Sequence, residues 1–302
     1  MTGKELALDG ESEHKDEADA TPAAKPRINW WTEIKGILWL LLAVFLFQSF
    51  VAKPFYIPSE SMLPGLLVGD RLVVSKYPYG WSFESPIFHL MPHIKGRLFG
   101  HMPKRGDIVI VTPPGKKEDY IKRVIGLPGD RVAVENGVVI LNGVPVKRGP
   151  LHYITIPDYG DVPLQEGGVS CDPSQYYDAL QSAPDGTHSC RLPIVTETLP
   201  NGRSYDTVEL GPSQGDNFPE ITVPKNEVFL MGDNRDRSAD SRFSESEEGL
   251  GGPVPWEYLG GRAEFITFSL DGSATWNPLT WFSDFRGDRV GLSLHPKQTR
   301  PQ

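Results

Sequence analysis

Ser61 is the side chain with the clearest setting for chemistry. It lies in residues 58–64, Pro-Ser-Glu-Ser-Met-Leu-Pro, about nine residues after the apolar stretch that is long enough to cross a membrane. A serine hydroxyl is a weak nucleophile and needs a neighbouring base to take its proton. A serine activated in this way just outside a bilayer predicts a hydrolase whose substrate also lies in the membrane.

Lys122 is the candidate base. Histidine is the usual base for a serine, but none of the seven histidines has a recognisable triad setting, and the chain has no Gly-x-Ser-x-Gly elbow. Lysine can take this role when burial lowers its pKa from about 10.4 toward neutrality. Lys122 lies in the apolar run 120–125, which is typical of a strand. A lysine in a strand usually faces solvent, so its spacing alone does not establish the assignment.

Residues 36–52 must place this chemistry near a membrane. They carry no charge and are at the short end of the length that spans a bilayer, with Trp30 and Trp31 as an interfacial anchor on one side. By the positive-inside rule the N-terminus is cytoplasmic and the remainder lies outside. This orientation depends on the basic residues that precede and follow the segment: Lys25, Arg27 and Lys35 before it, and Lys53 alone after it.

We interpret this segment as an uncleaved, single-pass anchor. Cleavage after Ala52 would place Phe50 at the −3 position, where an export signal needs a small residue. A buried core helix is the alternative, but the polar, acidic residues 1–24 offer nothing for it to pack against. Residues 1–35 are therefore predicted to be a largely disordered cytoplasmic N-terminus.

Beyond the anchor the sequence predicts a mainly β protein. Short β-branched runs occur at 71–75 and 107–112, and Asn-Gly turns between apolar runs predict a meander over 130–147. The 302 residues, 39% of them apolar, can bury a substantial core, and 31 Gly with 28 Pro fit strands and turns. A net charge of −9 argues against a nucleic-acid partner.

Residues 132–223 are predicted to be an inserted, β- and loop-rich subdomain in a catalytic core formed by 53–131 and 224–302. The character of the sequence changes most over 150–222, which are rich in Pro, Gly, Asp and Ser. Both cysteines, Cys171 and Cys190, lie there. In an oxidising compartment they could close a loop of about 20 residues, worth about 3 kcal/mol, and two unrelated free thiols are the alternative.

Four motifs occur in one order along the chain. They are Pro-Ser-x-Ser-Met-x-Pro, Lys-Arg-Gly-Asp-Ile from residue 104, Tyr-Ile-Lys-Arg-Val-Ile-Gly-Leu-Pro-Gly-Asp from residue 120, and Gly-Asp-Asn-Arg-Asp-x-Ser-x-Asp-Ser-Arg from residue 232. Together they strongly resemble bacterial type I signal peptidases, the leader peptidases that remove export signals from secreted proteins. The resemblance covers the anchor and about residues 53–131 and 224–270, and it is weak through 150–222.

The resemblance implies a two-part antiparallel β catalytic domain with a Ser/Lys dyad. Ser61 matches the nucleophile and Lys122 the general base. Ser59 matches the residue whose hydroxyl joins the Ser61 backbone N–H in the oxyanion hole, where a donor is worth about 2.7–4 kcal/mol. Ser238 matches the serine that orients the lysine. Further polar residues of the last motif are expected to hold the active-site loops through ion pairs: Asp233, Arg235, Asp240 and Arg242.

The implied reaction is cleavage of signal peptides through an acyl-enzyme, after small residues at the −1 and −3 positions. Neither a metal nor an organic cofactor is expected. The expected partners are the signal peptides of exported preproteins and the lipid bilayer, and the protein is expected to be a monomer of the bacterial inner membrane with a periplasmic catalytic domain. Shallow apolar substrate pockets would be lined by Phe55, Ile57, Met62, Leu66, Tyr120 and Ile121.

The chain departs from the family pattern in three places. Glu60 stands where a small residue is frequent, and Arg237 where asparagine is common. Residues 243–252 replace a shorter aromatic stretch. None of these departures replaces Ser61, Lys122 or Ser238.

Three other functions compete with this one. The first is a calcium-binding loop with an EF-hand-like spacing. It has Ser241 where the sharp turn needs glycine, and the sequence shows no flanking helices. A membrane-anchored β-rich interaction protein without catalysis would leave the serine and lysine motifs unexplained. A self-cleaving Ser/Lys protease of the SOS-repressor type would need a DNA-binding domain, for which the 35 residues before the anchor are too few and too acidic. The EF-hand-like positions 1, 3, 5 and 12 are Asp236, Ser238, Asp240 and Glu247.

Overall fold

The computed structural model describes residues 29–86, 92–157, 180–182, 184, 188–270 and 285–298. These residues form one N-terminal apolar helix and a mainly antiparallel β fold, as the sequence predicts. The chain divides into two units, residues 1–41 and 42–302. All the sheets lie in the second unit.

Helix α1 spans Trp30–Phe50. Asn29 caps its first turn, with the Trp31 N–H donating to Asn29 Oδ1 at 3.2 Å. Because of this cap the helix begins at Trp30 instead of residue 36, and it ends at Phe50 because the chain enters a strand at Ala52. Among the described residues it is the one helix that is long and apolar enough to cross a membrane, with a mean hydropathy of 1.6.

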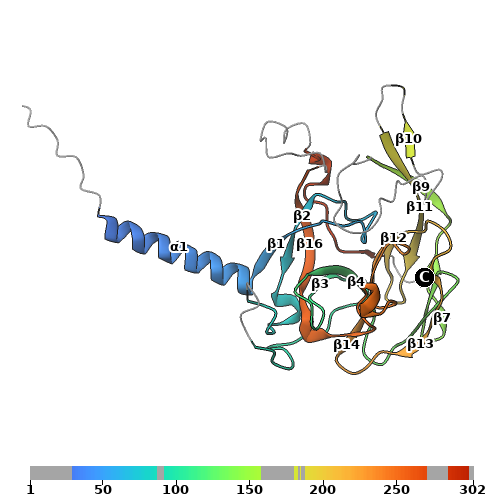
Figure 1. Ribbon diagram of the computed structural model, residues 1–302, viewed down its shortest axis with the longest axis horizontal. Helices are drawn as coiled ribbons and strands as arrows, with labels where there is room; N and C mark the ends of the chain where they lie inside the picture. Colours follow the sequence, from blue (N-terminus) through green and yellow to red (C-terminus); the bar gives the residue numbers. More distant parts are fainter. Residues whose placement is uncertain are drawn as a thin grey trace, which may run out of the picture. The chain divides into compact units, whose positions relative to one another are not determined.

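The main sheet brings together strands that are far apart in the sequence (Figure 1). Seven strands follow one another in the order β1-β2-β16-β3-β4-β14-β15, and all neighbours are antiparallel. Their bounds, in this order, are Ala52–Tyr56, Asp70–Ser75, Leu259–Ser269, Ile108–Val111, Tyr120–Gly126, Glu227–Met231 and Val254–Pro255.

Both faces of this sheet are covered. On β3, Ile108 and Ile110 belong to one hydrophobic cluster, whereas Val109 and Val111 belong to another. Side chains alternate between the two faces of a strand, so an unbroken apolar run indicates a strand that is buried on both sides. Each such side chain contributes roughly 1.5–3 kcal/mol to the free energy of folding when fully buried. The centre of the sheet is therefore well stabilised by apolar packing.

A four-stranded sheet contains the predicted meander. Its order is β13 (Phe218–Thr222), β5 (Arg131–Glu135), β6 (Val138–Leu141) and β7 (Val144–Pro145). Both Asn-Gly turns have positive φ angles. They are 48° at Asn136 and 76° at Gly137 in the first turn, and 55° at Asn142 and 80° at Gly143 in the second. Those angles match the twist of a two-residue hairpin, which is why Asn-Gly is favoured there.

The inserted region also contributes to a second sheet. Strands β10 (Leu180–Ser182), β11 (His188–Thr198), β12 (Arg203–Val208) and β17 (Lys297–Gln298) follow in this order, and β8 (Lys147–Arg148) and β9 (His152–Pro157) also pair with β11. Short 3₁₀ helices lie at Tyr77–Tyr79, Gln214–Asp216, Glu245–Glu247, Trp256–Tyr258 and Gly287–Arg289.

The second sheet packs against the residues that follow Ser61. Leu192, Ile194 and Val208 form a buried cluster with Leu63 and Leu67, which closely follow Ser61. Cys190 is also in this cluster. Cys171 lies outside the described residues, so its pairing with Cys190 stays a prediction.

Candidate active site

The structure brings Ser61 and Lys122 into contact. Ser61 Oγ lies 2.9 Å from Lys122 Nζ, although the two residues are 61 positions apart in the sequence. Ser61 lies in the turn that follows β1, and Lys122 lies on β4. The two side chains are buried, with exposed fractions of 6% and 3%. A hydroxyl and an amine at this distance can exchange a proton.

The turn that carries Ser61 is fixed at both ends. Before it, the Ile57 N–H donates to the Asp70 carbonyl at 2.9 Å. After it, the Leu66 N–H donates to the Met62 carbonyl at 3.0 Å, and both side chains are fully buried in the cluster beneath the sheet. Apolar packing therefore holds the backbone around Ser61, and the Ser61 hydroxyl is left facing Lys122.

Burial lowers the pKa of Lys122 to about 8. Asp240 and Asp233 oppose the shift, while Arg242 adds to it. The Nζ also lies 5.6 Å from the centre of the Tyr120 ring. Near pH 8 a large fraction of this lysine is uncharged and can accept a proton, which an exposed lysine with a pKa near 10.5 could not do.

Ser61 and Lys122 line a cleft of about 680 Å³. Apolar side chains from three strands form part of its wall: Phe55, Ile110, Tyr120 and Ile121, with Ile57 just after β1. Glu118 and Asp119, which precede β4, also border the cleft. Further lining residues are Asp236, Arg237, Phe243, Glu247 and Glu248. A cleft of this kind can hold an extended peptide against the serine.

Comparison with known proteins decides the family. The family description "Signal peptidase, peptidase S26" matches residues 30–268, which is most of the chain. The chain belongs to this family. It is therefore a serine endopeptidase, and an interaction protein without catalysis is excluded. Members of the family remove signal peptides and are anchored in bacterial membranes, which agrees with the apolar helix α1.

Similar proteins share most of the chain. Signal peptidase I of Rickettsia typhi is 31% identical over 273 residues, which cover 87% of this chain and 88% of the relative. Signal peptidase I of Rickettsia bellii strain OSU 85-389 is 32% identical over 273 residues, covering 87% and 80%. A solved signal peptidase I from Enterococcus faecalis has 23% identity and a TM-score of 0.26, covering 54% of this chain and 97% of that one.

Two of the six predicted pocket residues do not line the cleft of this peptidase. Met62 and Leu66 both have an exposed fraction of 0% and pack with Leu72 and Ile266 under the sheet. Met62 packs into this core although it follows Ser61 directly, so closeness to Ser61 in the sequence did not mean contact with the cleft. Ile110 takes part instead, and it pairs with Ile121 across β3 and β4. Only the strand register shows this neighbour, and no local sequence pattern predicts it.

Ser59 and Ser238 both line the cleft. Within the described residues, neither the Ser59 hydroxyl nor the Ser61 N–H makes a hydrogen bond, so both can donate to a substrate. The Ser238 hydroxyl is buried and has no hydrogen-bond partner there either. The hydrogen bond by which Ser238 was expected to orient Lys122 is therefore absent from this geometry, although the serine is placed at the site.

Gly232 is a site residue that the sequence analysis did not single out. A Cβ added to it would overlap Ser238 and would lie 2.5 Å from the Ser61 carbonyl oxygen. The close approach of these two segments thus needs glycine. Its place at the start of the last motif was the available signal.

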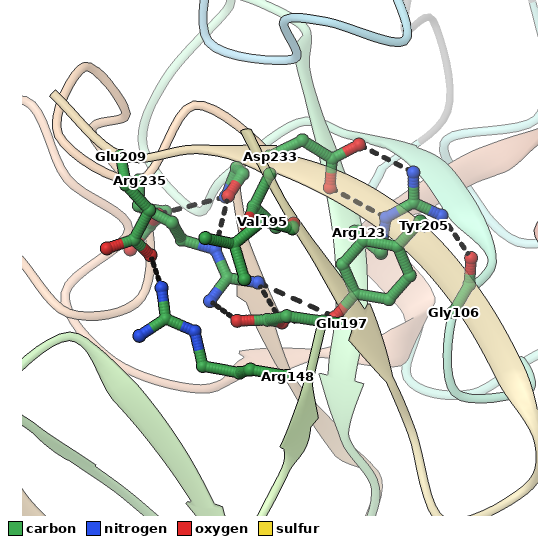
Figure 2. A network of polar contacts seen from close by, with 12 residues as sticks. Gly106, Arg123, Arg148, Val195, Glu197, Tyr205, Glu209, Asp233 and Arg235 are labelled. Carbon is green, nitrogen blue, oxygen red and sulfur yellow. Dashed lines mark hydrogen bonds and ion pairs between the residues drawn. The ribbon is translucent and has the colours of Figure 1, made fainter. Parts of the chain in front are cut away.

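The four residues of the last motif that were expected to form ion pairs all do so. Asp240 pairs with Arg242 at 2.9 Å. Asp233 pairs with Arg123 at 2.5 Å, and Arg235 pairs with Glu197 at 2.7 Å (Figure 2). The partners Arg123 and Glu197 lie outside that motif, so their roles were not predicted.

The calcium-loop alternative finds no support in the geometry. Asp240 is engaged by Arg242, and Glu247 accepts from the Ser244 hydroxyl at 2.6 Å. The Asp236 carboxylate accepts from the Leu210 N–H at 2.5 Å. Across the described ranges, no group of three or more His, Cys, Asp or Glu side chains is arranged to hold a metal ion.

Proposed function

We propose that this signal peptidase cuts exported preproteins after a small-x-small site, with Ser61 as nucleophile and Lys122 as general base. The observation that carries the proposal is the 2.9 Å contact between Ser61 Oγ and the buried amine of Lys122. The pKa of about 8 supports it, because a base must be uncharged at the working pH. No metal or organic cofactor has a part in this mechanism.

Acylation begins when neutral Lys122 takes the proton of Ser61 and Oγ attacks the scissile carbonyl carbon. The carbonyl oxygen becomes an oxyanion, which the Ser61 N–H and the Ser59 hydroxyl stabilise. The Lys122 ammonium then gives its proton to the leaving amine, and the ester of Ser61 remains. Each oxyanion donor is worth about 2.7–4 kcal/mol in such reactions.

Deacylation repeats these steps with water. Lys122 is neutral again, takes a proton from the attacking water, and returns it to Ser61 as the ester bond breaks. The released product is the signal peptide with a free carboxylate. Lys122 thus serves as base and acid in turn, which suits a group whose pKa lies close to the working pH.

Substrate selection rests on the apolar part of the cleft. Phe55, Ile57 and Ile121, with Ile110 and Tyr120, offer shallow contacts that favour small side chains at −1 and −3. We further propose that α1 crosses the inner membrane once, with a cytoplasmic N-terminus and a periplasmic catalytic domain, and that the enzyme works as a monomer. Its partners are then signal peptides and lipid, not nucleic acid.

The test is cleavage of a model preprotein by the detergent-solubilised full chain. Ser61→Ala and Lys122→Met should abolish cleavage while remaining folded by thermal unfolding. Lys76→Met is a matched control, because Lys76 is also buried, with a pKa lowered to about 8 by that burial, but does not line the cleft. It should keep activity. Near-normal cleavage by Lys122→Met would place the base elsewhere.

A further inference from the structure

Asn234 holds the peptide groups on both sides of Ser61. Its backbone N–H donates to the Ser61 carbonyl at 3.1 Å, and its Nδ2 donates to the Glu60 carbonyl at 3.2 Å. The Glu60 carbonyl and the Ser61 N–H belong to one planar peptide group. A hydrogen bond to that carbonyl therefore sets the direction of the N–H that donates to the oxyanion.

Arg235 fixes the turn that presents Asn234. Its Nε donates to the Gly232 carbonyl at 3.1 Å, so the side chain bridges the turn 232–235. Its two terminal nitrogens donate to the two oxygens of Glu197, at 2.8 and 2.7 Å. A bidentate pair fixes the plane of a guanidinium, and hence the direction of its Nε.

Glu197 comes from the inserted region, on β11, and has an exposed fraction of 0%. The Tyr205 hydroxyl on β12 donates to its Oε2 at 3.0 Å, which holds the carboxylate opposite Arg235 (Figure 2). The end of β12 also joins the turn directly. The Val208 N–H donates to the Asp233 carbonyl at 2.9 Å, and the Arg235 N–H donates to the Val208 carbonyl at 3.2 Å.

We propose that Glu197 is a positioning residue for the oxyanion hole, acting through Arg235 on the turn whose Asn234 orients the peptide groups around Ser61. The inserted region thereby takes part in catalysis without touching the substrate. This inference rests on the proposed function, in which the Ser61 N–H is an oxyanion donor. A buried ion pair is weak evidence for stability, because a well-packed apolar pair often serves as well. A role in positioning the turn that carries Asn234 would explain the presence of the Arg235–Glu197 pair.

The test compares kinetics with stability in the full-length enzyme. Glu197→Gln with Arg235→Met removes both charges together, so neither is left buried and unpaired, and the amide can still accept from Tyr205. Misplacement of a catalytic group by about 1 Å costs about 100-fold in rate. We expect kcat of the double variant to fall roughly 10- to 100-fold. Its KM should stay within about twofold of the wild-type value, and the acidic limb of its pH profile should not change.

A transition-state probe makes the test specific. A substrate-like peptide aldehyde adds to the serine hydroxyl, and its oxygen then occupies the oxyanion hole. Its affinity should fall by the same factor as kcat/KM in the double variant. Glu209→Gln is the matched control, because Glu209 pairs with Arg148 at 2.7 Å in the same region and makes no described hydrogen bond to residues 232–235. It should leave both values unchanged.

Tyr205→Phe keeps the charges paired and provides a second variant if the double variant does not fold. It should lower kcat about threefold with KM unchanged. Wild-type kcat and aldehyde affinity in a folded double variant, or in Tyr205→Phe, would overturn the inference. Failure of the proposed function looks different, because Ser61→Ala would then still cut.

Discussion

Lys122 and Arg123 are consecutive residues of β4 whose side chains have opposite surroundings. Lys122 Nζ contacts the Ser61 hydroxyl, whereas the Arg123 guanidinium binds Asp233 and donates to the Gly106 carbonyl at 2.7 Å. Side chains alternate along a strand, so one face carries the contact between Lys122 and Ser61 and the other an ion pair. Both side chains are buried. Arg123 keeps its charge and has a carboxylate in contact, whereas Lys122 has none in contact and can lose its charge near pH 8.

The rate should rise with pH through about 8. Lys122 must be neutral to act as a base, and the fraction of neutral lysine falls about tenfold for each pH unit below its pKa. With the pKa at about 8, kcat/KM should drop roughly tenfold between pH 7 and pH 6. Initial rates on a synthetic preprotein between pH 6 and 9 would measure this, and a profile that is flat below pH 8 would contradict the assignment.

Replacing Lys122 should stabilise the fold at pH 7. The folded-state pKa of about 8 lies below the unfolded value of 10.5, so burial of the charged amine lowers the free energy of unfolding. This loss of stability is complete below pH 8. The free energy of unfolding of the wild type should therefore rise with pH from about 8 to 10.5. Lys122→Met should gain on the order of 2–3 kcal/mol. Thermal unfolding at pH 7 would show it, and a lower melting temperature than the wild type's would refute it.

Gly232→Ala should inactivate the enzyme. The new methyl group would overlap Ser238 and press on the Ser61 carbonyl, and we expect kcat to fall about 100-fold or more. Gly65→Ala is the control, because a Cβ there would lie 3.7 Å from the Met62 carbonyl, which is an ordinary contact. Single-turnover cleavage by both folded variants tests this. Equal activity would mean that the backbone at residue 232 moves freely.

Met62→Ala should weaken the fold without changing substrate choice. Because Met62 is fully buried in the core, its truncation should cost about 2–5 kcal/mol in the free energy of unfolding. Phe55→Ala, at a residue that lines the cleft, should instead admit larger side chains at −1 or −3. Cleavage of a peptide set with Ala, Val or Leu at these positions separates the two variants. A changed preference of Met62→Ala for the side chains at −1 or −3 would mean that Met62 does line the substrate pocket.

Acidic substrates should be disfavoured near the cleft. Six carboxylates border it, against Lys122 and one arginine, Arg237; the carboxylates are Glu60, Glu118, Asp119, Asp236, Glu247 and Glu248. A peptide with Glu beside the small-x-small site should show lower kcat/KM than its Lys counterpart. The difference should shrink from low salt to about 0.5 M, where exposed charges are screened. Glu118→Gln should reduce it, and Glu135→Gln, on β5 away from this cleft, should not. An equal ratio at all salt concentrations would rule out a charge effect.

Local signals predicted several elements because their causes are local. The Asn-Gly turns between apolar runs predicted the hairpins of the meander, since those turns need positive φ angles that Asn and Gly adopt easily. The uncharged run before Ser61 predicted the apolar helix. Its start at Trp30 was missed because Asn29 caps it further upstream.

Contacts between distant segments could not be predicted in this way. Met62 and Leu66 were assigned to the pocket, but the direction of a side chain depends on which face the core covers. The role of Glu197 could not be predicted either, because its partner Arg235 is 38 positions away and no local pattern indicates such a pair.

The sequence by itself determined the chemical groups, the order of the motifs and an apolar helix long enough to cross a membrane, because residue type and spacing express these directly. Only the tertiary structure decided that Ser61 meets Lys122, that burial lowers the pKa of this lysine to about 8, and that the inserted region reaches the catalytic turn. The physical reason is that distance and desolvation arise from packing. The strand order β1-β2-β16-β3-β4 brings residues 61 positions apart to 2.9 Å, and the surrounding core then excludes water from the amine.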